Sequence, residues 1–506
     1  MSNITQETIE LAKSAQSNPD DLIKSFVQPG TATTGLQAYN LEAPSKKLFP
    51  VLTPLRNMMP RDTGGFAIQA NWKAITNINV ANMRAGVAEG LRGGRINHEQ
   101  SEYLAAFRGF GLENDVTFEA GYAAKGYEDV KALAVTSTLQ ALMIQEERTI
   151  LGGNTSLAMG TTPTPTTATA TTGGTIAAAT YNVICVALSL QAYLDMVGAN
   201  NGGIGQIFDP ATSAVPGQIT RTNAGGTTTI FGGGNAQQSA AASQATTGAT
   251  STLSATVTRV NGAVGYAWFV GTAGNERLQT VTSINSVTLT SLVGTGQLAS
   301  AIPGGAADRS TSAVDFDGLL VQAFKPGSNA TIIAQPTGVA GTGTPLTADG
   351  AGGIVEFEQL FVNMYNRYRL SPSVIMVSSQ ELINISKKVI QGSGAPLLQL
   401  LREIDGPTTI VAGTKIGSYM NKVTGDVVPV VVHPNMPAGT ILFYTQNVPY
   451  PMSGVPSVAR MLLRQDYYQL EWPLQQRKYD YGVYFDGVLQ HYAPFSMGII
   501  TNIANG

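Results

Sequence analysis

An amphipathic pattern follows the turn expected at Gly126. Apolar residues then recur at spacings of three, four and seven, which is typical of one face of a helix. Glu128 and Asp129 lie where the first turn is expected, and negative charge is favourable at that end of a helix dipole. The glycine pair Gly152-Gly153 provides a stop signal. The pattern predicts a long helix ending there, with this inner face: Ala132, Val135, Leu139, Leu142, Met143 and Ile150.

Alternating polar and apolar residues precede this helix in two places, residues 66–76 and 115–120. Both stretches predict strands. Between them lies a glycine-rich stretch that carries Arg84, Arg92 and Arg95. A projecting two-stranded hairpin is only marginally stable by itself, so it needs a neighbour to rest on. The arginines are interpreted either as a solvated loop tip or as groups that pair with acids of an adjacent subunit.

The composition changes after the long helix. Residues 161–174 repeat Thr, Pro and Ala, and residues 199–250 are rich in small and polar residues. Strand patterns lie at 175–188 and twice within 278–292, and two more strands flank Asn261-Gly262, a turn signal that predicts a β-hairpin. Short strands separated by turns indicate a β-sandwich. The run from Val260 to Gly271 resembles fibronectin type III and bacterial Ig-like modules, which implies that Tyr266 packs inward. We expect this sandwich to be separable from its flanks and to face outward.

Helical periodicity returns further on. An apolar stripe through Phe357, Leu360, Phe361, Met364 and Tyr368 predicts a helix that ends before Leu370-Ser-Pro, because a residue before proline disfavours helix. A buried strand at 374–377 and a second helix capped by Ser378 or Ser379 follow. From residue 410 onward the pattern is mostly strand. At the other end, residues 1–27 predict a short polar helix, and the proline-containing stretch 29–60 predicts an extended arm.

Composition sets further bounds. The 506 residues are too many for one core and favour two or three domains. Charged residues make up 12% and the net charge is −3, so charge gives no general attraction to nucleic acid. Cys185 is the only cysteine, which excludes an intrachain disulfide, and its apolar surroundings predict burial. No apolar run reaches 18 residues, and the N-terminal stretch does not resemble a secretory signal. We therefore expect synthesis in a bacterial cytoplasm and no membrane partner.

Residue patterns for catalysis are missing from the sequence. His98, His433 and His491 are isolated and match no metal-ligand spacing. Asp315 and Asp317 flank Phe316 and resemble an acid pair, but Asp317-Gly318 is more simply a turn. We expect no enzyme, no catalytic residues, no cofactor and no metal.

The order of these pieces resembles the major capsid proteins of tailed bacteriophages with the HK97-like fold. The resemblance covers residues 30–154 and 313–506. It rests on the hairpin, the long helix with its Glu-Glu-x-x-Ile-x-Gly exit, Asp315-Phe-Asp-Gly-Leu-Leu, Leu370-Ser-Pro-x-Val-Ile-Met-Val, and His433-Pro-Asn-Met-Pro-Ala-Gly-Thr. It implies an α+β fold with an inserted all-β Ig-like sandwich. The implied divisions are an N-terminal arm (1–60), an extended loop (61–105), a peripheral domain with a spine helix (106–154), the insertion (155–312), the return of the peripheral domain (313–372), an axial domain (373–458) and C-terminal strands of the peripheral and axial core (459–506).

The resemblance implies a structural protein that assembles with itself, as pentamers and hexamers, into an icosahedral shell. The shell would enclose the phage genome without sequence-specific DNA binding and would be located in the virion. Scaffolding, portal and decoration proteins are further expected partners, and assembly is expected either with a separate scaffolding protein or with none. The candidate contacts between subunits are Arg84, Arg92, Arg95, Glu146 and Glu147. The alternative function is a bacterial surface or secreted adhesin that carries an Ig-like module.

Overall fold

The computed structural model describes residues 46, 49–78, 86–126, 128–197, 208–223, 225–392 and 416–504. Contacts within the chain divide it into two units, one of Met1–Lys47 with Phe118–Val130 and one of Leu48–Thr117 with Lys131–Gly506. The predicted polar helix over residues 1–27 lies outside the described residues. In the first unit the described chain forms helix α4 (Phe118–Ala123). The strand predicted over 115–120 is therefore wrong after Thr117, where alanines and Glu119 favour helix over strand.

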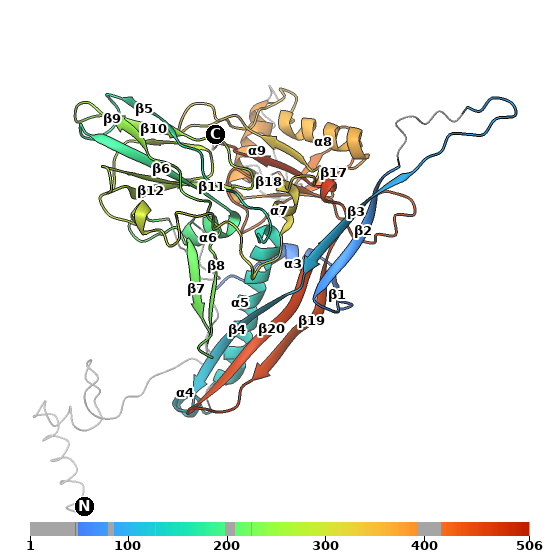
Figure 1. Cartoon of the computed structure of the whole chain (residues 1–506), viewed down its shortest axis with the longest axis horizontal. Coiled ribbons are helices and arrows are strands. Elements are labelled where there is room, and N and C mark those ends of the chain that lie inside the picture. Colours follow the sequence, from blue (N-terminus) through green and yellow to red (C-terminus); the bar gives the residue numbers. More distant parts are fainter. Residues whose placement is uncertain are drawn as a thin grey trace, which may run out of the picture. The chain divides into compact units, whose positions relative to one another are not determined.

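A four-stranded sheet supports the long helix. Its strand order is β1 (Arg61–Asp62), β19 (Ala459–Glu471), β20 (Lys478–His491) and β4 (Arg108–Thr117). Strand β1 runs parallel to β19, and the other pairs are antiparallel. Phe110 of β4 stacks on Phe485 of β20 with ring centroids 5.0 Å apart. Both rings belong to the buried cluster that also contains Leu142 of the helix. Figure 1 shows the helix running along this sheet.

Helix α5 (Val130–Gly152) confirms the predicted long helix and its stop. Gly126 has a φ of +80°, as a turn before the helix requires. A Cβ on Gly153 would lie 2.5 Å from the Phe316 carbonyl oxygen, so this position admits only glycine. The predicted inner face is only partly correct: Leu142 and Ile150 are buried, whereas Ala132 is exposed. Burial instead increases along the helix until nearly every residue of its last two turns is enclosed.

The segment before the four-stranded sheet forms an antiparallel hairpin of β2 (Gln69–Ile78) and β3 (His98–Ala106). The sequence prediction missed β3 and assigned the return strand to residues 115–120. The returning chain forms β3 and, after Phe107, continues as β4 in the four-stranded sheet. Strand β3 escaped detection because its outer residues are nearly all polar or alanine, which weakens the alternation on which strand prediction depends.

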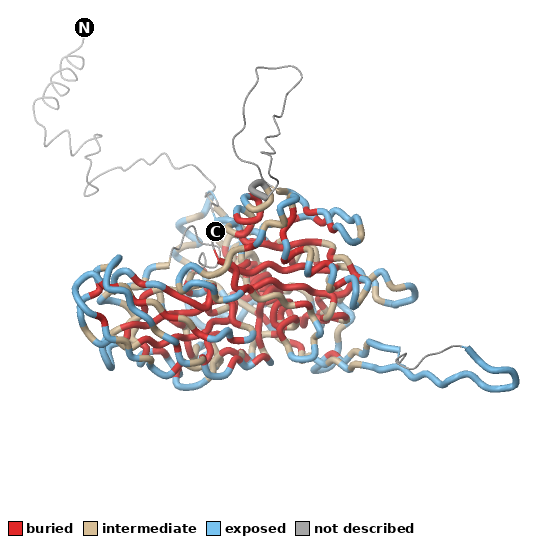
Figure 2. Tube along the Cα trace, turned by 90° about the horizontal axis from the view of Figure 1, so that it is seen from above, coloured by how far each residue is buried: buried red, intermediate tan, exposed pale blue. Residues whose placement is uncertain are grey.

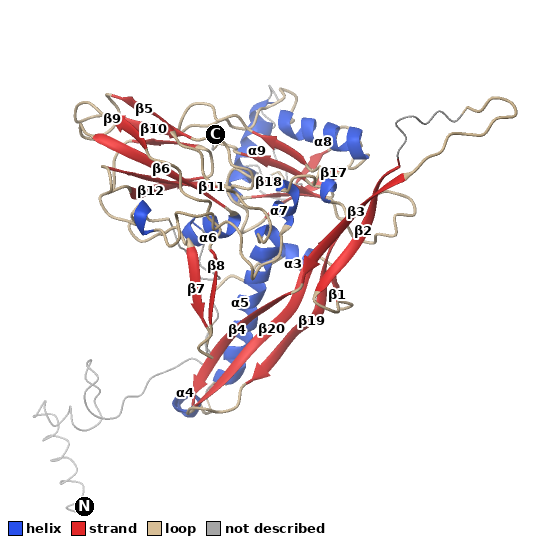
Figure 3. Ribbon diagram, in the orientation of Figure 1, coloured by secondary structure: helices blue, strands red, loops and turns tan. Residues whose placement is uncertain are grey.

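A six-stranded sheet forms the second core. Its strand order is β14 (Thr331–Ala334), β21 (Gly498–Thr501), β18 (Ile441–Tyr444), β15 (Val374–Val377), β17 (Val427–Val432) and β16 (Ser418–Met420). The nearby helices are α7 (Leu319–Phe324), α8 (Val355–Tyr368) and α9 (Ser379–Gly392). Phe357 and Phe361 of α8 meet Phe443 edge-on, at 5.0 and 5.7 Å. The predicted helix ending before Leu370-Ser-Pro is confirmed. Figure 3 shows the helices and strands of this region.

Residues 155–312 form two sheets that enclose an apolar layer. One sheet has the order β13 (Ser286–Leu289), β10 (Thr252–Thr256), β5 (Thr166–Ala170). The other has the order β12 (Arg277–Thr282), β11 (Gly265–Gly271), β6 (Thr180–Leu188), β9 (Ala242–Ala245). The segment also contains one helix, one hairpin and one 3-10 turn: α6 (Leu190–Val197), β7 (Gln218–Thr222) with β8 (Thr228–Gly232), and Ala299–Ala301. Cys185 and Tyr266 are buried between the sheets, as expected.

The hairpin predicted around Asn261-Gly262 is wrong. Gly262 does turn the chain, with a φ of +84°. However, β10 pairs with β13 and β5, whereas β11 pairs with β6 and β12. Eight residues separate the two strands, which is long enough for the chain to cross from one sheet to the other instead of folding back on itself.

The second sheet of this segment is buried on both faces. Val183, Cys185 and Trp268 face the first sheet. Ile184, Val186 and Phe269, on the opposite face, belong to one cluster with residues of the flanking chain, including Leu151, Phe316 and Leu319. Replacement of residues 155–312 by a linker would therefore expose part of the main core. The expectation that the flanks stay intact without this segment is therefore wrong. The resemblance of the segment to Ig-like modules remains a prediction.

We predict that Phe269→Ala destabilises the whole second unit. Phe269 is fully buried in the shared cluster, so its truncation should lower the free energy of unfolding by about 3–5 kcal/mol. Thermal unfolding followed by near-ultraviolet circular dichroism, with proteolysis of the flanks as a second probe, measures this. Ile230→Ala, at an exposed position, is the control. If the flanks resisted proteolysis after the sandwich had unfolded, the shared core would be refuted.

Candidate assembly interface

The hairpin of β2 and β3 is mostly exposed along its length. Figure 2 shows it as a pale blue projection from the buried red core. Its outer face carries Ile75 and Leu104, which are 63% and 67% exposed, beside the long Lys73–Glu102 ion pair of 4.0 Å. The described tip, residues 86–97, is exposed throughout and adds Val87, Leu91 and Ile96. Exposed apolar groups on an isolated two-stranded projection indicate a surface that another molecule covers.

The base of the hairpin is fixed to the core by an aromatic pair. Trp72 of β2 and Tyr103 of β3 lie opposite each other and stack at 5.8 Å. The indole Nε1–H of Trp72 donates to the His491 carbonyl oxygen at 3.0 Å. The base is therefore anchored while the tip is not.

The structure describes two of the three arginines that the sequence places in the tip. Arg84 lies outside the described residues. Arg92 and Arg95 are exposed, and neither forms an ion pair with an acid in the described ranges. Their pairing with an adjacent subunit remains a prediction.

Glu146 and Glu147 occupy a different setting from the one expected, because neither side chain has any exposed surface. Glu146 binds the guanidinium groups of Arg56, at 3.1 Å, and Arg61, at 2.5 Å, and accepts a hydrogen bond from the Tyr467 hydroxyl. These partners belong to the same chain. The expected role of the two glutamates as acidic partners of a neighbour's arginines is therefore corrected: buried and already bonded carboxylates are not available on the surface.

Glu147 caps a second helix. Helix α3 (Pro54–Met58) has no side-chain cap of its own at Thr53. The backbone N–H groups of Leu55 and Arg56 donate to Glu147 at 2.8 and 2.7 Å. Pro54 has no N–H to satisfy, so one carboxylate satisfies the free donors of this first turn. The segment preceding the hairpin is thereby tied to the end of the spine helix.

His433 is a further partner of Glu147. Its Nδ1 accepts the Asn435 N–H at 3.1 Å, so Nε2 carries the proton and donates to Glu147 at 2.6 Å. Both side chains are fully buried. The histidine of the His-Pro-Asn-Met-Pro sequence thus links the six-stranded sheet to the spine helix, a role that sequence reasoning missed. We use the name "glutamate junction" for Glu146, Glu147 and their partners Leu55, Arg56, Arg61, His433 and Tyr467.

Ionic and aromatic contacts reinforce the glutamate junction. Arg56 and Arg61 lie over the Tyr467 ring at 5.1 and 5.0 Å. Arg61 also binds Asp466 at 2.6 Å. Burial disfavours the charge of Arg61, but the bond to Asp466 and the charge of Glu146 outweigh it and raise the pKa of Arg61. Burial and the charge of Glu146 raise the pKa of Tyr467, which keeps its hydroxyl as a donor.

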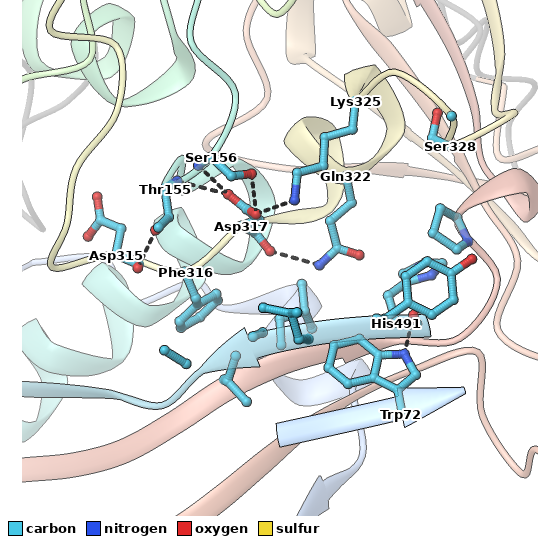
Figure 4. Close-up of a pocket in the computed structure, with 18 of the residues that line it drawn as sticks. Trp72, Thr155, Ser156, Asp315, Phe316, Asp317, Gln322, Lys325, Ser328 and His491 are labelled. Carbon is cyan, nitrogen blue, oxygen red and sulfur yellow. Dashed lines mark hydrogen bonds and ion pairs between the residues drawn. The ribbon is translucent and has the colours of Figure 1, made fainter. Parts of the chain in front are cut away.

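A cavity of about 570 Å³ lies beside the base of the hairpin. Figure 4 shows Trp72 and His491 at one end and Asp315 at the other. Asp317, which sequence reasoning assigned to a turn, accepts the N–H groups of Thr155 and Ser156, at 2.8 and 3.1 Å, and binds Lys325 at 2.5 Å. Although burial opposes ionisation, Lys325 and these donors lower the pKa of Asp317.

Asp315 differs from Asp317. It forms no ion pair with any cation in the described ranges, and burial raises its pKa to about 6 despite the fields of Arg221 and Arg108. The two acids flanking Phe316 thus line one cavity without forming a catalytic pair. Within the described chain no cluster of histidine, cysteine and acidic residues has the geometry of a metal site. No helix in the described ranges is long and apolar enough to cross a membrane.

Comparison with known proteins returned structures only, because the chain matches no protein-family model and no curated protein sequence. It is similar to the capsid of cyanophage A-1(L), with 10% identity over 93% of this chain and 97% of that chain and a TM-score of 0.40. The capsid of Myoviridae phage XM1 has 10% identity over 94% and 100% of the two chains and a TM-score of 0.37. The SrpI encapsulin of Synechococcus elongatus has 10% identity over 91% and 93%, with a TM-score of 0.37.

We predict that Glu146→Ala is strongly destabilising. It removes the fully buried carboxylate that the partly buried Arg56 and Arg61 and the Tyr467 hydroxyl share, and breaking such a pair costs roughly 3–5 kcal/mol, although Arg61 keeps its bond to Asp466. Chemical denaturation followed by tryptophan fluorescence gives the free energy of unfolding. Glu102→Ala removes an exposed carboxylate with a weak partner and should change stability by less than about 1 kcal/mol. Equal effects of the two variants would contradict a stabilising junction.

We predict a pH dependence from Asp315. Because its folded pKa of about 6 exceeds its ordinary value, the folded chain holds this proton more tightly than the unfolded chain. The free energy of unfolding should therefore fall as pH rises from about 4 to about 6, by roughly 2 kcal/mol. Asp315→Asn should lack this part of the slope. Urea denaturation at several pH values measures it, and identical slopes in both proteins would refute the assignment.

Proposed function

We propose that this chain is the shell-forming subunit of a tailed-phage head. One observation carries the proposal: an anchored, two-stranded hairpin exposes apolar side chains over its length beside a large internally bonded body. The sequence resemblance to HK97-like capsid proteins supports the same function. In the predicted architecture this hairpin is the extended loop, α5 is the spine helix, and the two sheets with their helices form the peripheral and axial domains.

The arrangement suits assembly by repetition. A projection that rests on the next copy makes a heterologous contact, and such contacts close into rings when the rotation between copies permits. Pentamers and hexamers are the rings that an icosahedral shell requires. Specific interfaces bury roughly 1,200–2,000 Å², and a long hairpin supplies such area without enlarging the core of the subunit. The net charge of −3 limits repulsion between close copies.

Several finer features belong to the same proposal. Arg84, Arg92 and Arg95 pair with acids of an adjacent copy. Scaffolding, portal and decoration proteins are the proposed further partners. The shell encloses DNA without reading its sequence, resides in the virion and assembles in the host cytoplasm. We propose no enzymatic activity.

The alternative, a surface adhesin with an Ig-like module, receives less support. An adhesive module presented at a surface is expected to fold as a separate body. Here one face of the sheet containing β6 and β11 is part of the main core. The exposed hairpin would also have no role in a monomeric adhesin.

Electron microscopy of the purified full-length chain tests the proposal. We expect closed shells with five- and six-fold clusters, formed over a range of protein concentrations or with a scaffolding protein. Ile75→Asp should abolish shells and leave a folded subunit, because Ile75 is exposed and charge would disrupt a covered apolar contact. Ile230→Asp, similarly exposed on β8, should assemble normally. A chain that stays monomeric under all these conditions would sink the proposal.

A further inference from the structure

The cavity beside the hairpin base has two chemically different ends. At one end Trp72, which stacks on Tyr103, contributes aromatic surface, and at the other end Asp315 contributes a carboxylate (Figure 4). The charges lining the cavity are three acids and two bases, a net charge of −1: Glu102, Asp315, Asp317, Arg108 and Lys325. Lys325 forms an ion pair with Asp317 at 2.5 Å, whereas the Asp315 carboxylate has no ion-pair partner in the described chain. Burial raises the pKa of Asp315, although a hydrogen bond with Ser312 and the charges of Arg221 and Arg108 act in the opposite direction.

The tip of the hairpin has the complementary chemistry. Leu91 and Ile96 are 70% and 57% exposed. Residues 86–97 carry two arginines against the single acid Glu89, a net charge of +1. A guanidinium is suited to pair with a partly buried carboxylate such as that of Asp315. The tip thus offers apolar side chains for the aromatic end of the cavity and a cation for Asp315.

The four-stranded sheet carries a second acidic surface, on the face opposite α5, to which the tip arginines could bind instead of the cavity. Its acids already have partners in the same chain. Asp115 and Asp480 bind Lys478 at 3.4 and 3.0 Å, and Asp486 binds Arg464 at 3.3 Å. Glu113 accepts the Tyr484 hydroxyl at 2.6 Å. A new cation gains less from carboxylates that already bind a cation of the same chain than from the partly buried Asp315, which has no ion-pair partner in the described chain.

We propose that the hairpin tip of a second copy of this chain docks in the cavity at the hairpin base, with Arg92 or Arg95 reaching Asp315 and Leu91 and Ile96 covering the aromatic end. This inference rests on the proposed shell function and deepens it by naming where the tip binds. Each subunit then uses its tip on one neighbour and its base on another, a head-to-tail arrangement that forms rings. The neighbour's tip would then cover the hydrogen bond that joins Trp72 to the His491 carbonyl oxygen at the base of the hairpin.

Disulfide trapping on assembled full-length chains tests the docking. The first variant carries Leu91→Cys with Ser328→Cys, which place one thiol on the tip and one on the cavity wall. The second carries Ile96→Cys with Glu102→Cys, which guards against a single pair with poor geometry or poor folding. The comparison variant carries Leu91→Cys with Asp480→Cys and probes the outer sheet face. Cys185 is buried, and the single-cysteine variants measure the background.

After mild oxidation with diamide, non-reducing electrophoresis should show loss of the monomer band and a ladder of linked subunits for either cavity pair. The single-cysteine variants and the Asp480 pair should stay monomeric. A ladder from the Asp480 pair alone, or shells in which both cavity pairs stay unlinked, would overturn the docking and leave the shell function standing. An unmodified chain that forms no shells would overturn both together. Arg92→Gln with Arg95→Gln, in the first variant, should reduce the ladder.

Discussion

The buried carboxylates of Glu146 and Glu147 are the constraint on which the rest of the structure depends. They lie in the last two turns of the spine helix, where the helix dipole disfavours negative charge, and they have no contact with water. Two charges in such a place persist only if specific partners satisfy them. The partners come from the segment before the hairpin, from β19 and from the loop after β17. Satisfying the pair therefore brings four distant parts of the chain together.

This constraint explains how a projecting hairpin stays oriented. Glu147 caps α3, and β1 pairs with β19 only a few residues later. The chain then enters the hairpin, whose base is held by Trp72. A projection that must meet a neighbour gains from such preorganisation, because less freedom is lost when the contact forms. The segment 155–312 contributes in the same sense, since its second sheet fills the main core and stiffens the body that carries the hairpin.

Sequence reasoning predicted the elements with strong local signals. The spine helix, its glycine stop, the α8 stripe and the buried strand at 374–377 follow from periodicity and stop residues in one stretch of chain. The sequence predicts the hairpin but misplaces its return strand, because the first five residues of β3 are all polar and leave no alternation to detect. The crossing at Asn261-Gly262 was missed because a turn signal fixes a change of direction and does not specify which strands pair.

The candidate contact residues also divide into those with a local sequence signal and those whose setting depends on distant residues. The exposed arginines were identified from their glycine-rich setting, and that setting is indeed a solvent-facing tip for Arg92 and Arg95. The sequence prediction makes the two glutamates partners of a neighbour's arginines, a role that requires surface positions, where charge usually lies. Their burial depends on Arg56, Arg61 and His433, which are between 85 and 286 residues away in sequence. No local pattern reveals partners at that separation, although two adjacent acids near a helix C-terminus are a signal that cations must lie close by.

Hydrogen–deuterium exchange, compared between free subunits and assembled particles, tests the central claim most directly. If the glutamate junction fixes the body that presents the hairpin, residues 53–62 should be protected to a similar degree in both states. The tip at 86–97 should exchange rapidly in the free subunit and become protected only in the particle. Rapid exchange of residues 53–62 in the free subunit, or a tip that remains unprotected in particles, would contradict the account.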